Sequence, residues 1–280
     1  MKQNLMTDDK IKSLPVYSRK AVTQYTRQGI TSNDFNVLEE EPLSIRVQGK
    51  PYAVVMRTPG DEIAHVVGFC LGEGIIDGYD DIKQIAFCDG ADTNVVTITL
   101  QEARRVKVGS ILERRGFVSQ TSCGICGKEV VQDLIQSVDP LQDETLVDWK
   151  DLLGCLDSFS NRQSLYLTTR TSHAAIAFDA DFQVQTVAED VGRHNAVDKA
   201  IGKLLIDGGI SRTICMMLSS RISYELVQKV ARARIQIILA MSRPTNLAVD
   251  LAEKLNITLA CIPDSETLLA YTGAWRLKRE

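Results

Sequence analysis

Apolar and polar residues alternate in several short runs of the chain, and in other runs the apolar residues recur at helical spacing. Over the first hundred residues this pattern predicts strands and one helix in the order ββαββ, at 43–48, 52–56, 61–76 (the helix), 82–88 and 95–100. These elements make a small α+β unit. The residues before them are polar and show no clear period, so an irregular N-terminal arm is expected over 1–35.

The pattern changes in the second half of the chain, where strands and helices alternate. Strands are expected at 174–178, 184–188, 213–218, 235–240 and 257–262, and helices at 149–159, 193–206, 222–232 and 246–255. Such alternation is typical of an α/β layer with a mostly parallel or mixed sheet. The chain is therefore divided into the arm (1–35), a small α+β domain (36–118), a cysteine loop with a connecting helix (119–145) and an α/β domain (146–280).

Composition narrows the class of protein. With 280 residues, 44% hydrophobic and 24% charged, the chain has the balance of an ordinary globular protein. The net charge of -4 argues against a nucleic-acid binder, because such proteins carry a basic excess. There is no export signal and no apolar run long enough to cross a membrane, so we expect a cytoplasmic protein without a membrane partner. The seven cysteines are then expected as reduced thiols.

Three junctions between a strand and the next helix are unusually polar, at 189–195, 219–223 and 242–246. Each contains an arginine, and each places free backbone N–H groups at a helix start, where anions bind. Ordinary helix capping would explain one such junction. Three on one sheet edge favour a ligand that carries phosphate. The candidate ligand-binding residues are His173, Asp190, Gly192, Arg193, His194, Asn195, Asp198, Lys199, Ser219, Ser220 and Arg221.

Cys123 and Cys126 stand apart from the other cysteines, because they lie in a small, polar, glycine-flanked run. A structural zinc site needs four ligands, and no second cysteine pair exists, so only a site shared between subunits stays open. A zinc deaminase would need a His-x-Glu motif, which is absent. A thioredoxin-like dithiol would need a preceding strand. Nearby cations favour thiolate chemistry on a loop by lowering the cysteine pKa: Arg104, Arg105, Lys107, Arg114 and Arg115.

Six ordered blocks make the sequence similar to the FdhD family, the sulfur-carrier accessory proteins required for active formate dehydrogenase. The blocks are 41–43, 68–69 with 72–76, 122–127, 171–175, 189–199 and 219–229. They occur in family order and span about residues 40–275. An ordered set of this kind is far more specific than a single Cys-x-x-Cys.

The resemblance implies a sulfurtransferase. Cys123 would take persulfide sulfur from a cysteine desulfurase and deliver it to molybdenum in a bis-molybdopterin guanine dinucleotide cofactor. Cys126 would assist the transfer or protect the intermediate. The resemblance also implies a C-terminal three-layer α/β domain of cytidine-deaminase-like topology without a metal of its own, and a homodimer. A non-catalytic chaperone that only binds the molybdenum cofactor is the alternative.

One stretch departs from the family. Where the family carries a Phe-Ala-Arg-Gly-x-Arg-like segment that contacts the cofactor, this chain has Ile262, Pro263, Asp264, Ser265, Glu266 and Thr267. The stretch has no basic residue, and its two carboxylates would repel phosphate. Either other residues hold the guanine dinucleotide or the affinity is weaker, and we keep the stretch as a candidate binding segment.

Overall fold

The structure is a computed structural model that describes residues 15–88, 93–109, 138–142 and 145–278. Its first elements are β1 (Tyr17–Thr26), β2 (Gly29–Leu38), β3 (Glu41–Val47), β4 (Lys50–Arg57), α1 (Glu62–Gly72), η1 (Tyr79–Asp81), β5 (Ile82–Phe87), β6 (Val95–Leu100) and α2 (Glu102–Lys107). The later helices are α5 (Trp149–Ser160), α6 (Ser164–Thr169), α7 (Arg193–Ile206), η2 (Ile210–Arg212), α8 (Tyr224–Arg232), α9 (Asn246–Lys254) and η3 (Ala274–Arg276). The later strands are β7 (Val147–Asp148), β8 (His173–Asp179), β9 (Val184–Asp190), β10 (Thr213–Leu218), β11 (Ile237–Ala240), β12 (Thr258–Asp264), β13 (Thr267–Thr272) and β14 (Leu277–Lys278).

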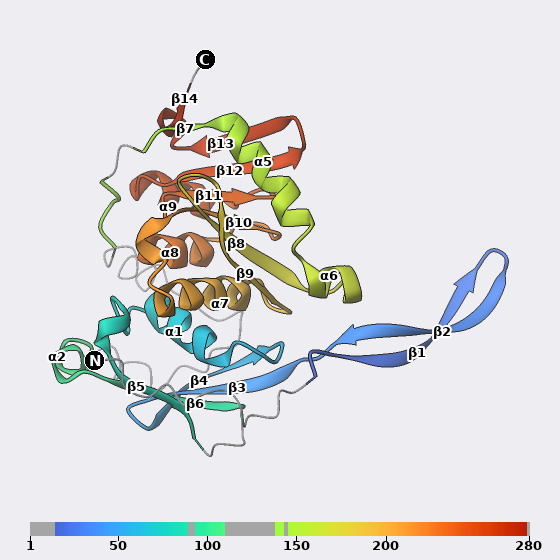
Figure 1. The fold of residues 1–280 in the computed structure, drawn as a ribbon, viewed down its shortest axis with the longest axis horizontal. Coiled ribbons are helices and arrows are strands. Elements are labelled where there is room, and N and C mark those ends of the chain that lie inside the picture. Colours follow the sequence, from blue (N-terminus) through green and yellow to red (C-terminus); the bar gives the residue numbers. More distant parts are fainter. Residues whose placement is uncertain (1–14, 89–92, 110–137, 143–144, 279–280) are drawn as a thin grey trace.

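The smaller of the two main sheets has the strand order β4-β3-β6-β5 and confirms the expected ββαββ unit. Alternate residues of β3 and β6 are buried, among them Leu43, Ile45, Val96 and Ile98. This alternation puts one apolar face of the sheet toward α1, which lies across it (Figure 1). The period-2 pattern in the sequence is therefore the direct cause of this layer.

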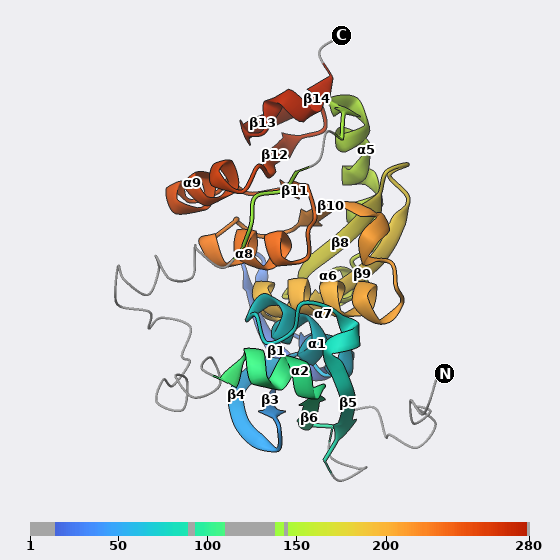
Figure 2. The same cartoon turned by 90° about the vertical axis from the view of Figure 1, so that its left-hand side faces the viewer.

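The larger sheet has six strands in the order β13-β12-β11-β10-β8-β9. Strands β10, β11 and β12 are parallel, β8 runs antiparallel to β10, and β9 runs antiparallel to β8 and hence parallel to β10. Helices α7, α8 and α9 pack on one face and α5 packs on the other, each with its own apolar core (Figures 1 and 2). The expected mixed α/β layer is confirmed, while the likeness to cytidine deaminases stays a prediction.

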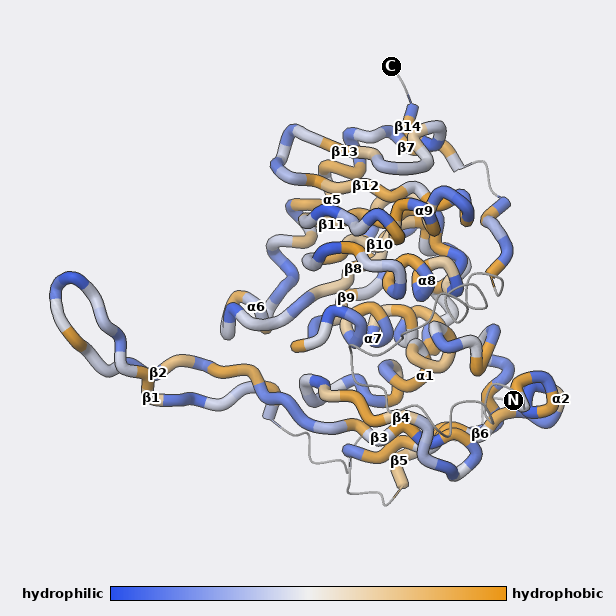
Figure 3. Tube along the Cα trace, turned by 180° about the vertical axis from the view of Figure 1, so that it is seen from behind, coloured by the Kyte–Doolittle hydropathy of each residue, from blue (hydrophilic) through white to orange (hydrophobic). Residues whose placement is uncertain are grey.

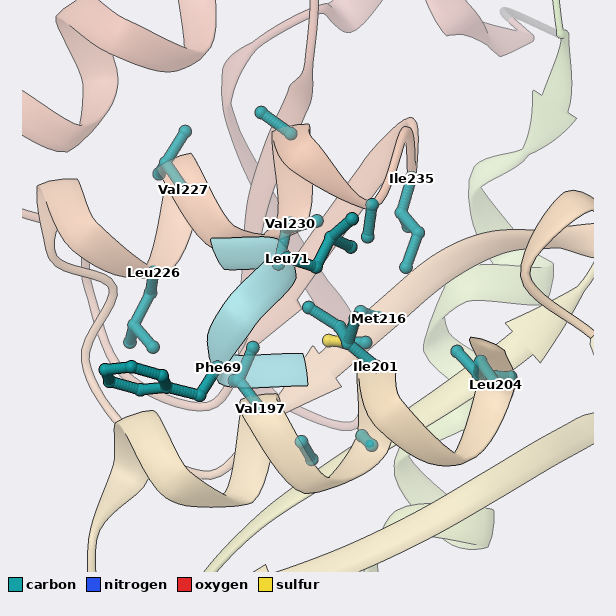
Figure 4. Close-up of a cluster of buried hydrophobic side chains, with 14 of the residues drawn as sticks. Phe69, Leu71, Val197, Ile201, Leu204, Met216, Leu226, Val227, Val230 and Ile235 are labelled. Carbon is teal, nitrogen blue, oxygen red and sulfur yellow. The ribbon is translucent and has the colours of Figure 1, made fainter. Parts of the chain in front are cut away.

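Helix α1 of the smaller unit packs directly on α7 of the larger one, so the two units share a core. Two glycines allow this close contact. A Cβ atom on Gly68 would lie 1.9 Å from the backbone oxygen of Asp198, and one on Gly202 would lie 1.8 Å from the backbone oxygen of Ala64. Figure 4 shows apolar side chains around the contact, including Phe69, Leu71, Val197, Ile201, Leu226, Val227 and Val230.

The expectation of an irregular arm over 1–35 is wrong for the part that the structure describes. Strands β1 and β2 form an antiparallel hairpin of ten residue pairs, from Tyr17 with Leu38 to Thr26 with Gly29. Both strands are rich in β-branched and aromatic residues, which favour extended backbone. The hairpin was missed because almost all its side chains are exposed, so neither face carries the contrast that marks a half-buried strand.

Beyond the hairpin, other short elements of the structure were not expected from the sequence: the helices α2 and α6, the strands β7, β13 and β14, and the 3-10 helices η1, η2 and η3. Of the segment 119–145, expected to hold the cysteine loop and a connecting helix, residues 119–137 and 143–144 lie outside the described residues. Among the residues that the structure describes, no helix is both long and apolar enough to cross a membrane.

Candidate functional site

The polar junctions meet at one edge of the larger sheet. Strands β9, β10, β11 and β12 point the same way, so their carboxyl ends lie along a single edge. The antiparallel strand β8 begins at that edge, and its first residue, His173, is paired with Asp190 at the end of β9. Ligands of open α/β sheets bind beyond such ends. The sequence-based expectation that the three junctions share an edge is confirmed by this register.

His173 and Ser219 are in contact at the centre of this edge. The His173 Nδ1 atom lies 3.3 Å from the Ser219 hydroxyl, which also accepts a hydrogen bond of 3.0 Å from the backbone N–H of Ala174. The pKa of His173 is lowered, first by its partial burial and then by the positive charge of Arg193. A neutral imidazole beside a hydroxyl and an arginine can exchange hydrogen bonds with a polar ligand.

The first turn of α7 places Arg193 and His194 at the same edge, where both are partly exposed. The Nε2 atom of His194 lies 2.9 Å from a carboxylate oxygen of Glu225 and 3.5 Å from the Ser223 hydroxyl, both near the start of α8. The hydrogen bond from His194 holds the pKa of Glu225 below its usual value. The starts of α7 and α8 are therefore tied together by side chains. Glu225 was not among the expected residues.

The rest of the same motif turns away from the edge and into the protein. The Asp190 carboxylate is fully buried and accepts hydrogen bonds from the backbone N–H of Thr58 at 3.1 Å and from the Asn195 amide at 2.8 Å. The Lys199 ammonium lies 2.7 Å from Asp190 and donates to the Thr58 carbonyl at 2.8 Å. The Asn195 amide also donates to the Met56 carbonyl at 2.7 Å. These residues join the larger sheet to the end of β4.

Asp198 makes a second buried ion pair, with Lys229 of α8. Two oxygens of Asp198 lie 2.7 and 2.9 Å from the Lys229 ammonium. Burial raises the pKa of the Asp198 carboxyl, and the charge and hydrogen bonds of Lys229 oppose that rise. The same ammonium lies 5.4 Å from the centre of the Phe69 ring, a cation–π contact that reaches α1.

The expected ligand residues thus divide into two groups. His173, Arg193, His194 and Ser219 lie at the edge with part of their surface exposed, and Arg221 is exposed beside them. Four of the other candidates make buried contacts where the two units pack together, a region called the joint from here on, and Asp198 does so through Lys229 of the larger unit: Asp190, Asn195, Asp198 and Lys199. Direct ligand binding by this second group stays a prediction, and its observed contacts favour a positioning role.

The helix starts differ in how they are capped. The backbone at the starts of α7 and α8 receives no side-chain cap from Gly192 or Ser223, whereas the Thr245 side chain caps α9 by accepting from the Ala248 N–H at 3.4 Å. Capping was the structural alternative considered for all three junctions, and it applies to the third. In the second junction, Ser220 is buried and donates from its hydroxyl to the Arg221 carbonyl at 3.0 Å.

The segment 262–267 forms the end of β12, a turn and the start of β13. It lies at the same edge as the other junctions, but β11 separates its strand from β10. Asp264 and Glu266 are exposed, and the backbone N–H of Glu266 donates to Asp264 at 3.0 Å, which lowers the pKa of the Asp264 carboxyl. The segment therefore presents two carboxylates, in keeping with the departure noted in the sequence.

Of the cations expected near Cys123 and Cys126, Arg104 has a different role. It is buried, donates to the carbonyls of Ile75 and Gly74 at 2.8 and 2.7 Å, and pairs with Asp77. It therefore holds the chain after α1 in place. The two cysteines, Arg114 and Arg115 lie outside the described residues, so their expected roles stay predictions.

Sequence reasoning missed the partners that the smaller unit contributes. Thr58 is separated from Asp190 by 132 positions, and no local spacing relates the two. Glu189 is a second case, because its carboxylate accepts from the backbone N–H groups of Leu165 and Tyr166 at 2.8 Å each. It thereby caps α6 and does not face the edge. Only a correlation between distant positions would have revealed either contact.

Comparison with known proteins identifies the family. The model of the FdhD/NarQ family matches residues 38–278. The chain belongs to this family. The sulfur carrier protein FdhD of Streptomyces coelicolor is 36% identical over 274 residues, which cover 94% of this chain and 96% of that protein. The protein of the same name from Thermoplasma acidophilum is 33% identical over 271 residues, which cover 93% of each chain.

The fold is shared with a solved structure. The crystal structure of a formate dehydrogenase accessory protein from Desulfotalea psychrophila superposes with a TM-score of 0.75 and covers 94% of this chain and 100% of that one. Its sequence identity is 21%, so this likeness concerns the fold alone.

Proposed function

We propose that this FdhD/NarQ family member is a sulfur carrier that serves formate dehydrogenase. It takes sulfur from a cysteine desulfurase as a persulfide on Cys123 and delivers it to the bis-molybdopterin guanine dinucleotide cofactor. The observation that carries the proposal is the match, over almost the whole length of both chains, to proteins named sulfur carrier protein FdhD. The sheet edge with its histidines and arginines supports it as a place for the acceptor.

Loading of Cys123 is an exchange of one S–S bond for another. The Cys123 thiolate attacks the outer sulfur of the desulfurase persulfide, that S–S bond breaks, and the desulfurase leaves as its thiolate. No net oxidation occurs. To release the sulfur as sulfide, the Cys126 thiolate attacks the inner sulfur of the Cys123 persulfide. This forms a Cys123–Cys126 disulfide, which a cellular thiol reductant then returns to the dithiol.

The described residues fit a phosphate-bearing acceptor at the edge. The uncapped starts of α7 and α8 offer backbone N–H groups, and Arg193 and Arg221 offer positive charge beside them. His173 and Ser219 lie between these helix starts and can bind a polar group. The acidic turn at 264–266 does not fit phosphate, so the guanine dinucleotide is expected on the β8, β9 and β10 side of the edge.

The loading step is tested by mass spectrometry of the full-length protein after incubation with a cysteine desulfurase and cysteine. A gain of one sulfur atom is expected on the peptide that contains Cys123, and none in Cys123→Ala protein. Cys88→Ala is the matched control, because Cys88 is an exposed cysteine remote in sequence from the pair, and its loss should leave the gain unchanged. Equal labelling of the Cys123→Ala protein would overturn the proposal.

The rival proposal is a chaperone that binds the molybdenum cofactor without sulfur chemistry. The exposed edge supports it, because cofactor binding alone would use the same residues. The sulfur-carrier proposal and the chaperone proposal predict different results in a strain that lacks its own copy of the protein. If the protein is a sulfur carrier, Cys123→Ala protein should fail to restore formate dehydrogenase activity to this strain. If it is only a chaperone, the same variant should restore that activity.

A further inference from the structure

Two cysteines face each other in the apolar core between α5 and the larger sheet. Helix α5 lies in front of this sheet in Figure 1 and behind it in Figure 3. Its buried face carries Cys155 together with Leu152 and Phe159. Cys215 belongs to β10, an interior strand that pairs with β8 and β11. Both cysteines are buried in this one core and both are free thiols, so the fold brings together two thiols that are distant in the sequence.

The two thiols are linked in a short hydrogen-bonded chain. The Cys155 thiol donates to the backbone carbonyl of Asp151, one turn earlier in α5, at 3.7 Å. Because its proton is used there, Cys155 accepts from Cys215 in the hydrogen bond between them. Burial, followed by this hydrogen bond and by the charge of Cys155, raises the pKa of Cys215 well above its usual value. The Cys215 thiol therefore keeps its proton, and its sulfur lies in contact with that of Cys155.

A cleft of about 520 Å³ opens beside α5 and reaches the first of these cysteines. It lies between α5 and the turn that joins β8 to β9, and its lining includes Gly154, Cys155 and Phe182. Gly154 leaves room there, because a Cβ atom placed on it would meet no atom within 4 Å. Cys215 does not line the cleft and is fully buried. A small reagent dissolved in water therefore reaches Cys155 before it reaches Cys215.

We propose that Cys155 and Cys215 are a peroxide-sensitive pair that closes into a disulfide between α5 and β10. Hydrogen peroxide is the oxidant and enters through the cleft. The Cys155 sulfur, after losing its proton, attacks one peroxide oxygen, the O–O bond breaks and hydroxide leaves, which gives a sulfenic acid. The Cys215 sulfur then attacks the Cys155 sulfur, the S–O bond breaks and the S–S bond forms. The two thiols lose two electrons and two protons, and the peroxide becomes two water molecules.

The two cysteines have different roles in this reaction. Cys155 reacts with peroxide because it lines the cleft, and Cys215 resolves the sulfenic acid because its sulfur is in contact with it. The disulfide ties α5 to β10, and Ser219 follows β10 at the sheet edge. A cross-link between distant parts of a chain restricts the unfolded state and so stabilises the fold. Cys123 and Cys126 take no part, so the inference is independent of sulfur transfer.

Peptide mapping of the full-length protein without reductant tests the proposal. After treatment with hydrogen peroxide and alkylation of the remaining thiols, the peptides of Cys155 and Cys215 should be joined, with the loss of two hydrogen atoms. Cys88 is exposed and shows by its own oxidation that the peroxide was active. Cys261 is the matched control, because it is buried, donates to the Ser242 carbonyl at 3.1 Å and should stay a thiol. Oxidised Cys88 without any joined peptides would overturn the proposal.

Two variants test the order of events. In Cys215→Ala protein the sulfenic acid has no resolving thiol, so a dimedone-type reagent for sulfenic acids should label Cys155. In Cys155→Ala protein the thiol that lines the cleft is missing, so Cys215 should stay reduced while Cys88 is oxidised. Oxidation of Cys215 as complete as in the unchanged protein would contradict the proposal, and so would an unlabelled Cys155 in the Cys215→Ala protein. Circular dichroism of the reduced proteins checks that both variants are folded.

Discussion

Helix α7 presents two surfaces that come from one stretch of sequence and have opposite characters. Arg193 and His194, in its first turn, face the open sheet edge. Asn195, Asp198 and Lys199 follow directly and are buried against the smaller unit. The comparison shows that a dense run of polar residues need not form a single binding site. Half of this run can hold a ligand, and the other half fixes the position of the unit that leads into the cysteine segment.

The buried half is a joint made of ion pairs and close backbone contact. A buried ion pair is not strong evidence of added stability, because desolvation offsets the attraction between the charges. Removing one partner is different, since the other charge is left buried and unpaired. The joint should therefore tolerate single substitutions far less well than the exposed edge.

The largest effect is expected from Lys229→Met, which leaves the Asp198 carboxylate buried without its partner. The free energy of unfolding should fall by about 3–5 kcal/mol, measured by urea denaturation near neutral pH. Glu225→Ala, which breaks the partly exposed pair with His194, is the matched control and should cost no more than about 1 kcal/mol. Equal losses in the two variants would remove the distinction between joint and edge.

The close packing of α1 on α7 should also make the joint more sensitive to substitution than an exposed helix surface, with a smaller loss of unfolding free energy than for Lys229→Met. In Gly202→Ala the new Cβ atom would collide with the backbone oxygen of Ala64, so the helices must separate. The loss should be about 1–3 kcal/mol. Gly154→Ala in α5 meets no atom within 4 Å, and alanine's better helix propensity should raise stability by about 0.5–1 kcal/mol. If Gly202→Ala left the free energy of unfolding unchanged, the contact between α1 and α7 would not be as close as described.

Much of the edge was predictable because its signals are local. Strand and helix periods placed α7 at the residues observed, and parallel strands necessarily bring their junctions to one edge. The joint was not predictable, because Asp190 meets Thr58 only after the two units have folded together. The candidate ligand residues do lie near one another, but their burial, which separates the exposed ones from the buried ones, depends on what packs against α7. The strands β1 and β2 were missed because their side chains are almost all exposed and neither strand has a buried face.

The smallest expected effect on the free energy of unfolding comes from a buried histidine in the joint, and it is expected only at acidic pH. His65 of α1 is fully buried, and its pKa is lowered well below the usual value, first by burial and then by the charges of Lys199, Lys229 and Arg57. The side chain of Asn195 opposes this shift only in part.

The sign of the pH dependence follows from which state takes up the proton. Below about pH 6.5, the ordinary pKa of histidine, the unfolded chain is protonated at His65 while the folded chain is not. Stability should therefore fall as the pH drops below that value, by at most about 1.4 kcal/mol per pH unit from this group. The curve of unfolding free energy against pH should be flatter in acid for His65→Leu than for the unchanged chain. His194→Ala, at the exposed edge, should keep the His65 contribution, whereas parallel curves for His65→Leu and the unchanged chain would show that the joint does not hold this imidazole neutral.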